Sequence, residues 1–292
     1  MSPIERIKIT ESPRDAQQGL PYVISPEKRA SFVNALLKVN YDVIDVGSFV
    51  SEKAIPQMAS QSKVFDLIDK SLGNAKLMVI VGNLRGGKDA SAHPKTDILG
   101  FPYSMSENFL LRNINSTISK ANNTITDLSS LCSDKDKELR IFISMAFGNP
   151  YGDKWSIEEL QEHISRFIHL GVKTITLSDT IGVATSDLVT ELFERLIPLW
   201  PDIDFGLHIH TKPHDWNDKI QAAWDAGCRS YDGVLNGIGG CPMTGYELLG
   251  NLNTLNLWKF IVDNNIPSKI NETALAEALT VSGTIYEMQE FK

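Results

Sequence analysis

Residues 174–210 read TITLSDTIGVATSDLVTELFERLIPLWPDIDFGLHIH, and this stretch contains the pattern that decides the fold. Two short apolar runs, at 174–178 and 204–210, flank an amphipathic segment at 186–199 that ends before Pro201. The short runs are apolar at successive positions, as buried parallel strands are, and the middle segment has the length and pattern of a helix. The stretch therefore predicts one strand–helix–strand unit of a parallel sheet.

The same alternation continues on both sides of this unit. We expect eight strands, at residues 7–11, 43–49, 76–81, 98–103, 140–147, 174–178, 204–210 and 230–235. We expect longer helices at residues 26–39, 57–71, 106–131, 156–170, 186–199, 215–226, 247–264 and 272–291, and only a short helix in the Gly-, Lys- and His-rich connection at 82–97.

Eight such units without a break in composition predict one α/β domain over residues 1–292. The expected fold is a closed parallel (β/α)8 barrel, a TIM barrel, with an extra C-terminal helix. An open doubly wound sheet is the alternative, but no G-x-G-x-x-G pattern follows the first expected strand.

Composition narrows the class of function. The 36 acidic and 28 basic side chains give a net charge of −8, whereas nucleic-acid-binding proteins normally present a basic face. No apolar run reaches the roughly 18 residues of a membrane span, and residues 1–10 resemble neither a signal nor a transit peptide. Cys132, Cys228 and Cys241 are odd in number and lack metal-ligand spacing, which indicates a reducing compartment. We therefore expect a cytoplasmic protein that binds neither nucleic acid nor a membrane.

Polar residues stand where the expected strands end, and in a β/α barrel the chemistry takes place at that rim. His208 and His210 are two residues apart on a strand, so both side chains point to the same face. Asp15, which follows the first strand, supplies a carboxylate from another strand end. One carboxylate and two imidazoles leave coordination positions of a metal ion open. This suits a catalytic Mg²⁺ or Mn²⁺ ion, whose octahedral coordination would be completed by substrate and water oxygens. A pair of hydrogen-bonded structural histidines is the alternative.

Charged residues at the same rim have several interpretations. Arg14 is suited to hold a developing enolate or a carboxylate, and a rim salt bridge is the alternative. We expect neighbouring residues at a strand end to point apart, so Arg14 need not pair with Asp15. Asp45 and Asp179 each fit a general base, a group that orients a histidine, or a helix-capping carboxylate.

The stretch 237–245 contains four glycines around Cys241. A glycine-rich loop either moves or wraps closely around a ligand, so Cys241 is a candidate proton donor that closes over the site. An incidental surface cysteine is the alternative.

Segments in order along nearly the whole chain resemble the 3-hydroxy-3-methylglutaryl-CoA lyases, which belong to the DRE-type metallolyase barrels. Together they are highly specific. They are Pro13-Arg14-Asp15 with Gln18 (family P-R-D-G-x-Q), VIDVGSFVSEKAIPQM at 43–58, NLRG at 83–86 (family N-L-K-G), SENF at 106–109 with NINS at 113–116, SDTIGV at 178–183 (family G-D-T-I-G-V), His208-Ile209-His210 and GIGGCP at 237–242 (family G-L-G-G-C-P).

The resemblance implies a role for each candidate residue and a reaction. Asp15, His208, His210 and Asn251 would bind the divalent cation, Arg14 would stabilise an enolate, Cys241 would be the loop acid, and Asp45 and Asp179 would orient or deprotonate. The cation would act as Lewis acid and template while the C2–C3 bond of a 3-hydroxyacyl-CoA breaks. The default substrate is 3-hydroxy-3-methylglutaryl-CoA, which yields acetyl-CoA and acetoacetate, and we expect a homo-oligomer, a dimer.

Four positions depart from the family pattern. Asp45 stands for the family's Glu and Ala16 for its Gly, and residues 211–215 read TKPHD where the family has D-T-x-G. Asn251 lies ten residues after Cys241, one more than in the family. These departures leave the acyl group open.

Two alternative functions remain. One is a carbon–carbon condensing enzyme similar to isopropylmalate or homocitrate synthases, whose motif resembles the tetrapeptide at 236–239; Cys241 favours the lyase, because those synthases have another residue there. The other is a non-catalytic barrel that binds an acyl-CoA or a partner protein, which the converging metal-type ligands disfavour.

Overall fold

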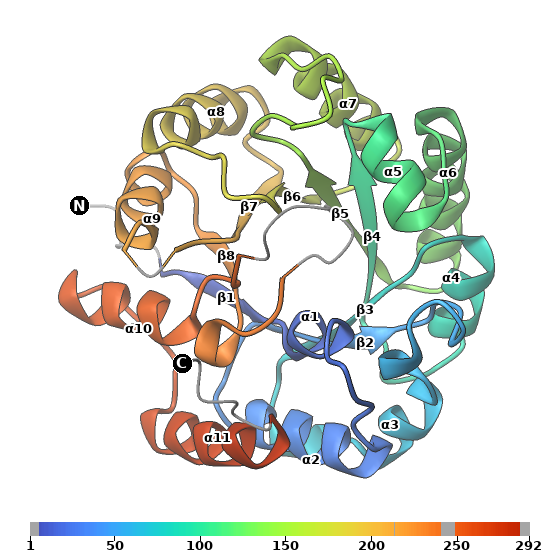
Figure 1. Cartoon of the computed structure of the whole chain (residues 1–292), viewed down its shortest axis with the longest axis vertical. Helices are drawn as coiled ribbons and strands as arrows, with labels where there is room; N and C mark the ends of the chain where they lie inside the picture. Colours follow the sequence, from blue (N-terminus) through green and yellow to red (C-terminus); the bar gives the residue numbers. More distant parts are fainter. Residues whose placement is uncertain (1–5, 213, 241–248, 287–292) are drawn as a thin grey trace.

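Eight parallel strands close into a barrel in which β1 pairs with both β2 and β8 (Figure 1). The computed structural model describes residues 6–212, 214–240 and 249–286. The strands are β1 (Lys8–Glu11), β2 (Val43–Ser48), β3 (Lys76–Ile80), β4 (Ile98–Ser104), β5 (Glu138–Ser144), β6 (Thr174–Asp179), β7 (Asp204–Ile209) and β8 (Ser230–Gly233). The predicted closed (β/α)8 barrel is confirmed, and the open sheet is excluded.

Helices surround the barrel and fill the connections between strands (Figure 1). They are α1 (Pro13–Gln18), α2 (Pro26–Leu37), α3 (Gln61–Leu67), α4 (Leu84–Ser91), α5 (Glu107–Ile114), α6 (Ile118–Asp134), α7 (Ile157–His169), α8 (Ser186–Leu199), α9 (Trp216–Asp225), α10 (Thr254–Asp263) and α11 (Glu272–Ile285), with short 3₁₀ turns η1 (Pro56–Met58), η2 (Lys70–Leu72) and η3 (Leu235–Gly237). Within the described part of the chain, no helix combines the length and the apolar character needed to cross a lipid bilayer.

Two of the expected helices are divided in the structure. The helix expected at 106–131 ends at Ile114, because Asn115 adopts a left-handed conformation (φ 51°), and the Thr117 side chain caps a new helix, α6. The helix expected at 57–71 is divided into η1, α3 and η2, and Ser60 between the first two also has a left-handed backbone (φ 57°). The start of α10 lies at Thr254, later than expected, because residues 251 and 253 form bridges to the ends of the strands.

The barrel interior is apolar on one side. Buried Met78, Ile98 and Phe142 form a cluster with Val43 and Ile80 that is separate from the main core. The alternate residues of the same strands belong to the main core between the sheet and the helices, so this second cluster faces inward. Strands β2–β5 therefore supply an apolar half of the interior.

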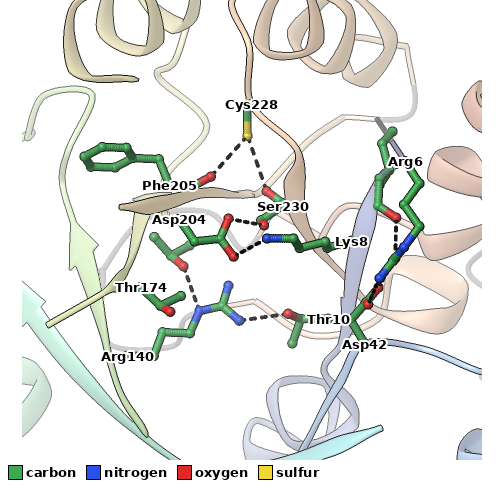
Figure 2. Close-up of polar contacts among 12 residues, drawn as sticks. Arg6, Lys8, Thr10, Asp42, Arg140, Thr174, Asp204, Phe205, Cys228 and Ser230 are labelled. Atoms are coloured by element: carbon green, nitrogen blue, oxygen red, sulfur yellow. Dashed lines mark hydrogen bonds and ion pairs between the residues drawn. The ribbon is translucent and has the colours of Figure 1, made fainter. Parts of the chain in front are cut away.

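The other side of the interior is polar and is organised by Arg140 of β5. Its guanidinium donates from Nε to Thr176 Oγ1 (2.8 Å), from Nη1 to Thr10 Oγ1 (2.8 Å) and from Nη2 to Asp232 Oδ1 (2.6 Å). Figure 2 shows the Arg140–Thr10 contact across the barrel. The guanidinium therefore connects β5 with β6, β1 and β8.

At the opposite end of the barrel from the rim, a second set of polar contacts joins β7 to β8 and, across β8, to β1 (Figure 2). Asp204 of β7 accepts from Lys8 Nζ of β1 (2.8 Å) and from Ser230 Oγ of β8 (2.7 Å). This end of the barrel thus has its own polar contacts, separate from the rim where Asp15 and the histidines lie.

Glu11 of β1 lies on the opposite face of the strand from Thr10 and is fully buried. Its carboxyl accepts from the Leu235 backbone N–H (2.8 Å) and from Thr254 Oγ1 (2.6 Å). It therefore connects β1 to both ends of the connection between β8 and α10. Burial raises the pKa of Glu11 to about 8, although these two hydrogen bonds oppose the shift.

The raised pKa of Glu11 predicts that stability falls as pH rises from about 5 to about 8. Over this range the folded state retains a proton that the unfolded state has released, so the free energy of unfolding falls by up to about 1.4 kcal/mol per pH unit. Glu11→Gln removes the titration and should flatten this decline. Urea unfolding at pH 5, 6.5 and 8 measures the effect, with exposed Glu277→Gln as the matched control. Equal pH slopes in the wild type and Glu11→Gln would contradict the prediction.

Candidate active site

Asp15, His208 and His210 converge at the rim of the barrel. One ligand atom from each residue lies within 4.8 Å of those of the other two. Asp15 lies in α1, directly after β1, whereas the histidines lie on β7 and on the residue that follows it. The predicted common face of the two histidines is observed, since their Nε2 atoms are 3.4 Å apart.

Both imidazoles are oriented by a contact of their Nδ1 atom. His210 Nδ1 lies 3.0 Å from the Leu249 carbonyl oxygen, so Nδ1 carries the proton and Nε2 has a free lone pair. His208 Nδ1 lies 3.4 Å from Asp232 Oδ2, the carboxylate–histidine arrangement that is typical around metal ligands. Both Nε2 atoms therefore face the same place beside Asp15.

Buried oxygens without partners show that these residues fit a divalent cation. Asp15 Oδ2 and Asn251 Oδ1 are buried and have no hydrogen-bond partner among the described residues. Asn251 Nδ2 donates to the Ile238 carbonyl oxygen (3.0 Å), and this contact fixes the orientation of the amide. Two oxygens and two imidazole nitrogens are a donor set that binds Mg²⁺ or Mn²⁺. The role of Asn251 as a cation ligand stays a prediction.

The charges of the site favour the metal-binding protonation state of Asp15 and of His210, but not of His208. Burial alone would raise the pKa of Asp15, but the Arg14 charge and the two histidines hold this pKa below its usual value. Burial and the nearby His208 lower the pKa of His210, which keeps its imidazole neutral. For His208, burial favours the neutral form, but the hydrogen bond and charge of Asp232 outweigh it and raise the pKa. An ionised carboxylate and a neutral imidazole are the forms that ligate metals.

Arg14 is held in one orientation by two carboxylates. Its Nε and Nη2 atoms donate to Asp45 Oδ2 at 2.9 and 2.6 Å, and its Nη1 atom donates to Asp15 Oδ1 at 2.9 Å. The expectation that neighbouring residues point apart is wrong for Arg14 and Asp15, because residues 13–18 form a helical turn instead of an extended strand end. Gln18 Oε1 accepts a further bond from Nη1 (3.0 Å).

Asp45 and Asp179 have different surroundings. Asp45 is fully buried beneath Arg14, and burial raises its pKa although Arg14 opposes the shift. Asp179 accepts four backbone N–H bonds of 2.7–3.3 Å from residues 181–184. Asp45 thus holds Arg14, a contact that the sequence interpretations did not include. Asp179 caps the loop at 181–184, ahead of α8, and not a helix itself.

Asp232 and Arg140 belong to the site, but the sequence analysis missed both. Asp232 touches His208 and pairs with Arg140, and each side chain is buried in the barrel. The sequence did contain a pattern that could have predicted them. The expected strand at 140–147 has one charged residue, Arg140, and the expected strand at 230–235 also has one, Asp232. Buried charges are normally paired, so two such strands predict an ion pair.

A cavity of about 480 Å³ opens over these residues. Arg14, Asp15, His208, His210 and Asp232 line one side of it, and its other lining residues include Ile80, Pro102, Phe109, Ile114 and Phe142. The polar groups of the site are therefore accessible to a small molecule.

Cys241, the proposed loop acid, lies outside the described residues. Thr211, the first residue of the departure at 211–215, lies beside the Asn251 segment, since its N–H donates to the Gly250 carbonyl oxygen (3.0 Å).

Comparison with known proteins assigns the family. Residues 6–281 match the model of the HMGL-like family. The chain belongs to this family. The resemblance to the 3-hydroxy-3-methylglutaryl-CoA lyases is thus confirmed, and with it the expected enzyme class of carbon–carbon lyases.

Relatives and structures agree with this assignment. The chain is 30% identical to the rat cytoplasmic 3-hydroxy-3-methylglutaryl-CoA lyase over 82% of this chain and 69% of the relative. It is 27% identical to the (R)-citramalyl-CoA lyase of Chloroflexus aurantiacus, over 94% of this chain and 89% of that enzyme. An HMG-CoA lyase structure from Acinetobacter baumannii, in complex with coenzyme A and 3-methylmalate, superposes with a TM-score of 0.90, 26% identity and coverage of 98% of this chain and 92% of that one.

We expect Asp232→Asn to weaken divalent-cation binding. Loss of the carboxylate charge beside His208 Nδ1 removes the group that orients the imidazole, and such changes typically cost about 10- to 100-fold in metal affinity. Titration with Mn²⁺ followed by calorimetry measures the effect. Asp204→Asn is the matched control, because Asp204 lies at the other end of the barrel. An Mn²⁺ affinity unchanged in a folded Asp232→Asn protein would contradict this role.

Proposed function

We propose that this protein is a divalent-metal-dependent lyase that cleaves the C2–C3 bond of a 3-hydroxyacyl-CoA thioester. The default substrate is 3-hydroxy-3-methylglutaryl-CoA, with acetyl-CoA and acetoacetate as products. The observation that supports this most is the ligand set of Asp15, His208 and His210 beside a guanidinium, Arg14, in one cavity. We further propose that the enzyme acts in the cytoplasm, as the 30% identical cytoplasmic relatives do.

The reaction balances without a redox partner or a second substrate. The C3 hydroxyl loses its proton and becomes a carbonyl as the C2–C3 bond breaks. The electron pair of that bond becomes the enolate of acetyl-CoA, and one proton returned to C2 completes the product. The chain must therefore stabilise negative charge on the thioester oxygen and supply a proton to carbon.

A bound divalent cation would supply Lewis-acid polarisation of the substrate oxygens. Asp15, His208, His210 and Asn251 are the residues that would hold it. Arg14 is the proposed partner of the enolate oxygen, and Asp45 keeps the guanidinium in place by accepting two of its bonds. Cys241 remains our proposed proton donor, and Asp179 shapes the loop at 181–184.

Citramalyl-CoA is the second candidate substrate, supported by the citramalyl-CoA lyase relative. It differs from the default substrate by one methylene between the carbinol carbon and the free carboxylate. Both carry a hydroxyl and a methyl group on the carbon where cleavage takes place, so the same site residues suit either one.

Incubation with a panel of 3-hydroxyacyl-CoA thioesters and Mn²⁺, followed by mass spectrometry, tests the proposed function. We expect acetyl-CoA together with acetoacetate or pyruvate, and no products after exhaustive chelation, because the buried Asp15–histidine set needs the cation to act on substrate oxygens. Asp15→Asn should cut kcat by several powers of ten. Products formed at full rate without a metal, or a condensation product from acetyl-CoA and a keto acid, would overturn the proposal.

Arg14→Met should lower kcat about 10²- to 10³-fold, the usual cost of removing one oxyanion-stabilising donor. Its effect on Mn²⁺ affinity should be small, since Arg14 is not a ligand. Asp45→Asn should produce a smaller loss, and the double variant should be no slower than Arg14→Met alone, because Asp45 acts through Arg14. Steady-state kinetics of the three variants measures this coupling, and additive losses would show that Asp45 has an independent role.

A further inference from the structure

The strand that carries Asp45 is irregular near its carboxyl end. Asp45 is opposite Met78 of β3, and the next paired residue of β2 is Gly47, so Val46 is an extra residue in the strand. Met78 faces the barrel interior, whereas Gly47 is opposite Val79, which belongs to the core on the helical side. Val46 belongs to the same core, so two successive residues of β2 face the helices. This arrangement is a β-bulge, a feature that re-aims neighbouring side chains and is frequent beside active sites.

The side chain of Gln61, the first residue of α3, packs against this bulge. Gln61 is 5% exposed, and its Nε2 atom donates to the Val46 carbonyl oxygen (3.4 Å). The amide also occupies the place that a side chain at position 47 would take, since a Cβ atom on Gly47 would collide with both Oε1 and Nε2 of Gln61. The glycine therefore lets the amide reach the strand, and the amide supplies a donor to the extra residue of the bulge.

A buried arginine, Arg29 of α2, orients the Gln61 amide. Its Nη2 atom donates to Gln61 Oε1, so the other end of the amide faces Val46. Arg29 is 2% exposed, and its other acceptors are the Ala59 carbonyl oxygen (2.9 Å from Nη1) and Met58 Sδ (3.7 Å from Nη2). Burial lowers the pKa of Arg29 to about 10, which leaves the side chain charged at neutral pH. A buried cation is costly unless its donors are satisfied, so Arg29 holds Gln61 in this orientation.

The bulge is connected to the cavity through Asp45. This residue directly precedes Val46, and its Oδ2 atom accepts bonds from both Nε and Nη2 of Arg14. The backbone of the bulge sets the direction of the Asp45 side chain, and Asp45 in turn holds the guanidinium of Arg14. Direct contacts thus run from Arg29 through Gln61 and the bulge to Arg14.

We propose that Arg29 and Gln61 are positioning residues, which fix the Arg14 guanidinium in the cavity from the helical side of the barrel. Neither is among the described residues that line the cavity, so both act through the bulge and Asp45. Their effect on catalysis rests on the proposed function, whereas their effect on the position of Arg14 does not. A displacement of about 1 Å at a reacting centre can cost about 100-fold in rate.

The Nε–H signal of Arg14 in N–H correlation NMR spectra tests the positional part of the inference. This N–H donates to Asp45, and its signal is identified as the one that disappears in Arg14→Met. We expect Gln61→Leu, which removes both ends of the amide, to shift or broaden this signal in the protein without metal or substrate. An Arg14 signal that stays unchanged in folded Gln61→Leu would overturn the inference.

Two further variants make this experiment specific. Asn34→Leu is the matched control and should leave the Arg14 signal in place, because it removes a bond from Asn34 Nδ2 to the Leu67 carbonyl oxygen of α3 (3.2 Å) instead of one to β2. Gln61→Glu keeps an acceptor for Arg29 and removes only the donor to the bulge, so it provides the test if Gln61→Leu fails to fold. We expect it to change the Arg14 signal as well, and an unchanged signal would count against the proposal in the same way.

Steady-state kinetics tests the catalytic part. With Mn²⁺ and 3-hydroxy-3-methylglutaryl-CoA, we expect Gln61→Leu to lower kcat about 10-fold or more with little change in KM, because Arg14 acts in the transition state. In the Arg14→Met background the same substitution should cost less than about 2-fold, since the group that it positions is gone. Equal losses in both backgrounds would show a merely structural role and overturn the catalytic part. Absence of cleavage by the wild type would overturn the proposed function, and the NMR signal would then decide the positional part by itself.

Discussion

The guanidinium of Arg140 is the interaction on which the site depends. A buried cation inside a barrel is costly unless its donors are satisfied, and here each of its three nitrogens has a partner on another strand. The partner on β8, Asp232, is therefore held with one oxygen on Arg140 and the other beside His208. The guanidinium thus connects four strands of the barrel, and its ion pair with Asp232 helps to orient a candidate metal ligand.

The connection from β8 to α10 shows how an irregular segment contributes to a site with defined geometry. The Leu252 N–H donates to the Ile209 carbonyl oxygen and the Thr211 N–H to that of Gly250, so residues 250–252 follow the end of β7. Glu11 holds both ends of the connection from the other side. These contacts place the Asn251 amide and the Leu249 carbonyl at the cation site. Residues 250–252 are thus held in place by backbone hydrogen bonds, although they belong to no helix or regular strand.

Periodicity alone predicted the parts of the site that lie on strands. His208 and His210 share a face because strands have a period of two, and Asp15 lies close to them because parallel strands end at the same rim. Asp232 was missed because its partner, Arg140, lies 92 residues away in the sequence. The division between α5 and α6 was also missed, because it depends on the left-handed backbone of a single residue, Asn115. The role of Asp179 depends on the loop conformation that supplies its four N–H donors, which the sequence pattern does not define.

The shorter carboxylate at position 45 shows why the acyl group does not follow from family membership alone. Asp45 Oδ2 accepts both Nε and Nη2 of Arg14, so the length of this side chain helps to decide where the guanidinium lies in the cavity. The strand is irregular directly after Asp45, with a register shift between Asp45 and Gly47, and Gly47 leaves room for the side chain of Gln61. Arg29 holds Gln61 in turn, so the backbone that carries Asp45 is supported from the helical layer. Because Asp45 holds Arg14 from a supported backbone, the length of the side chain at position 45 bears directly on the position of the guanidinium beside Asp15 and in the cavity, and so on the acyl group that the cavity accepts.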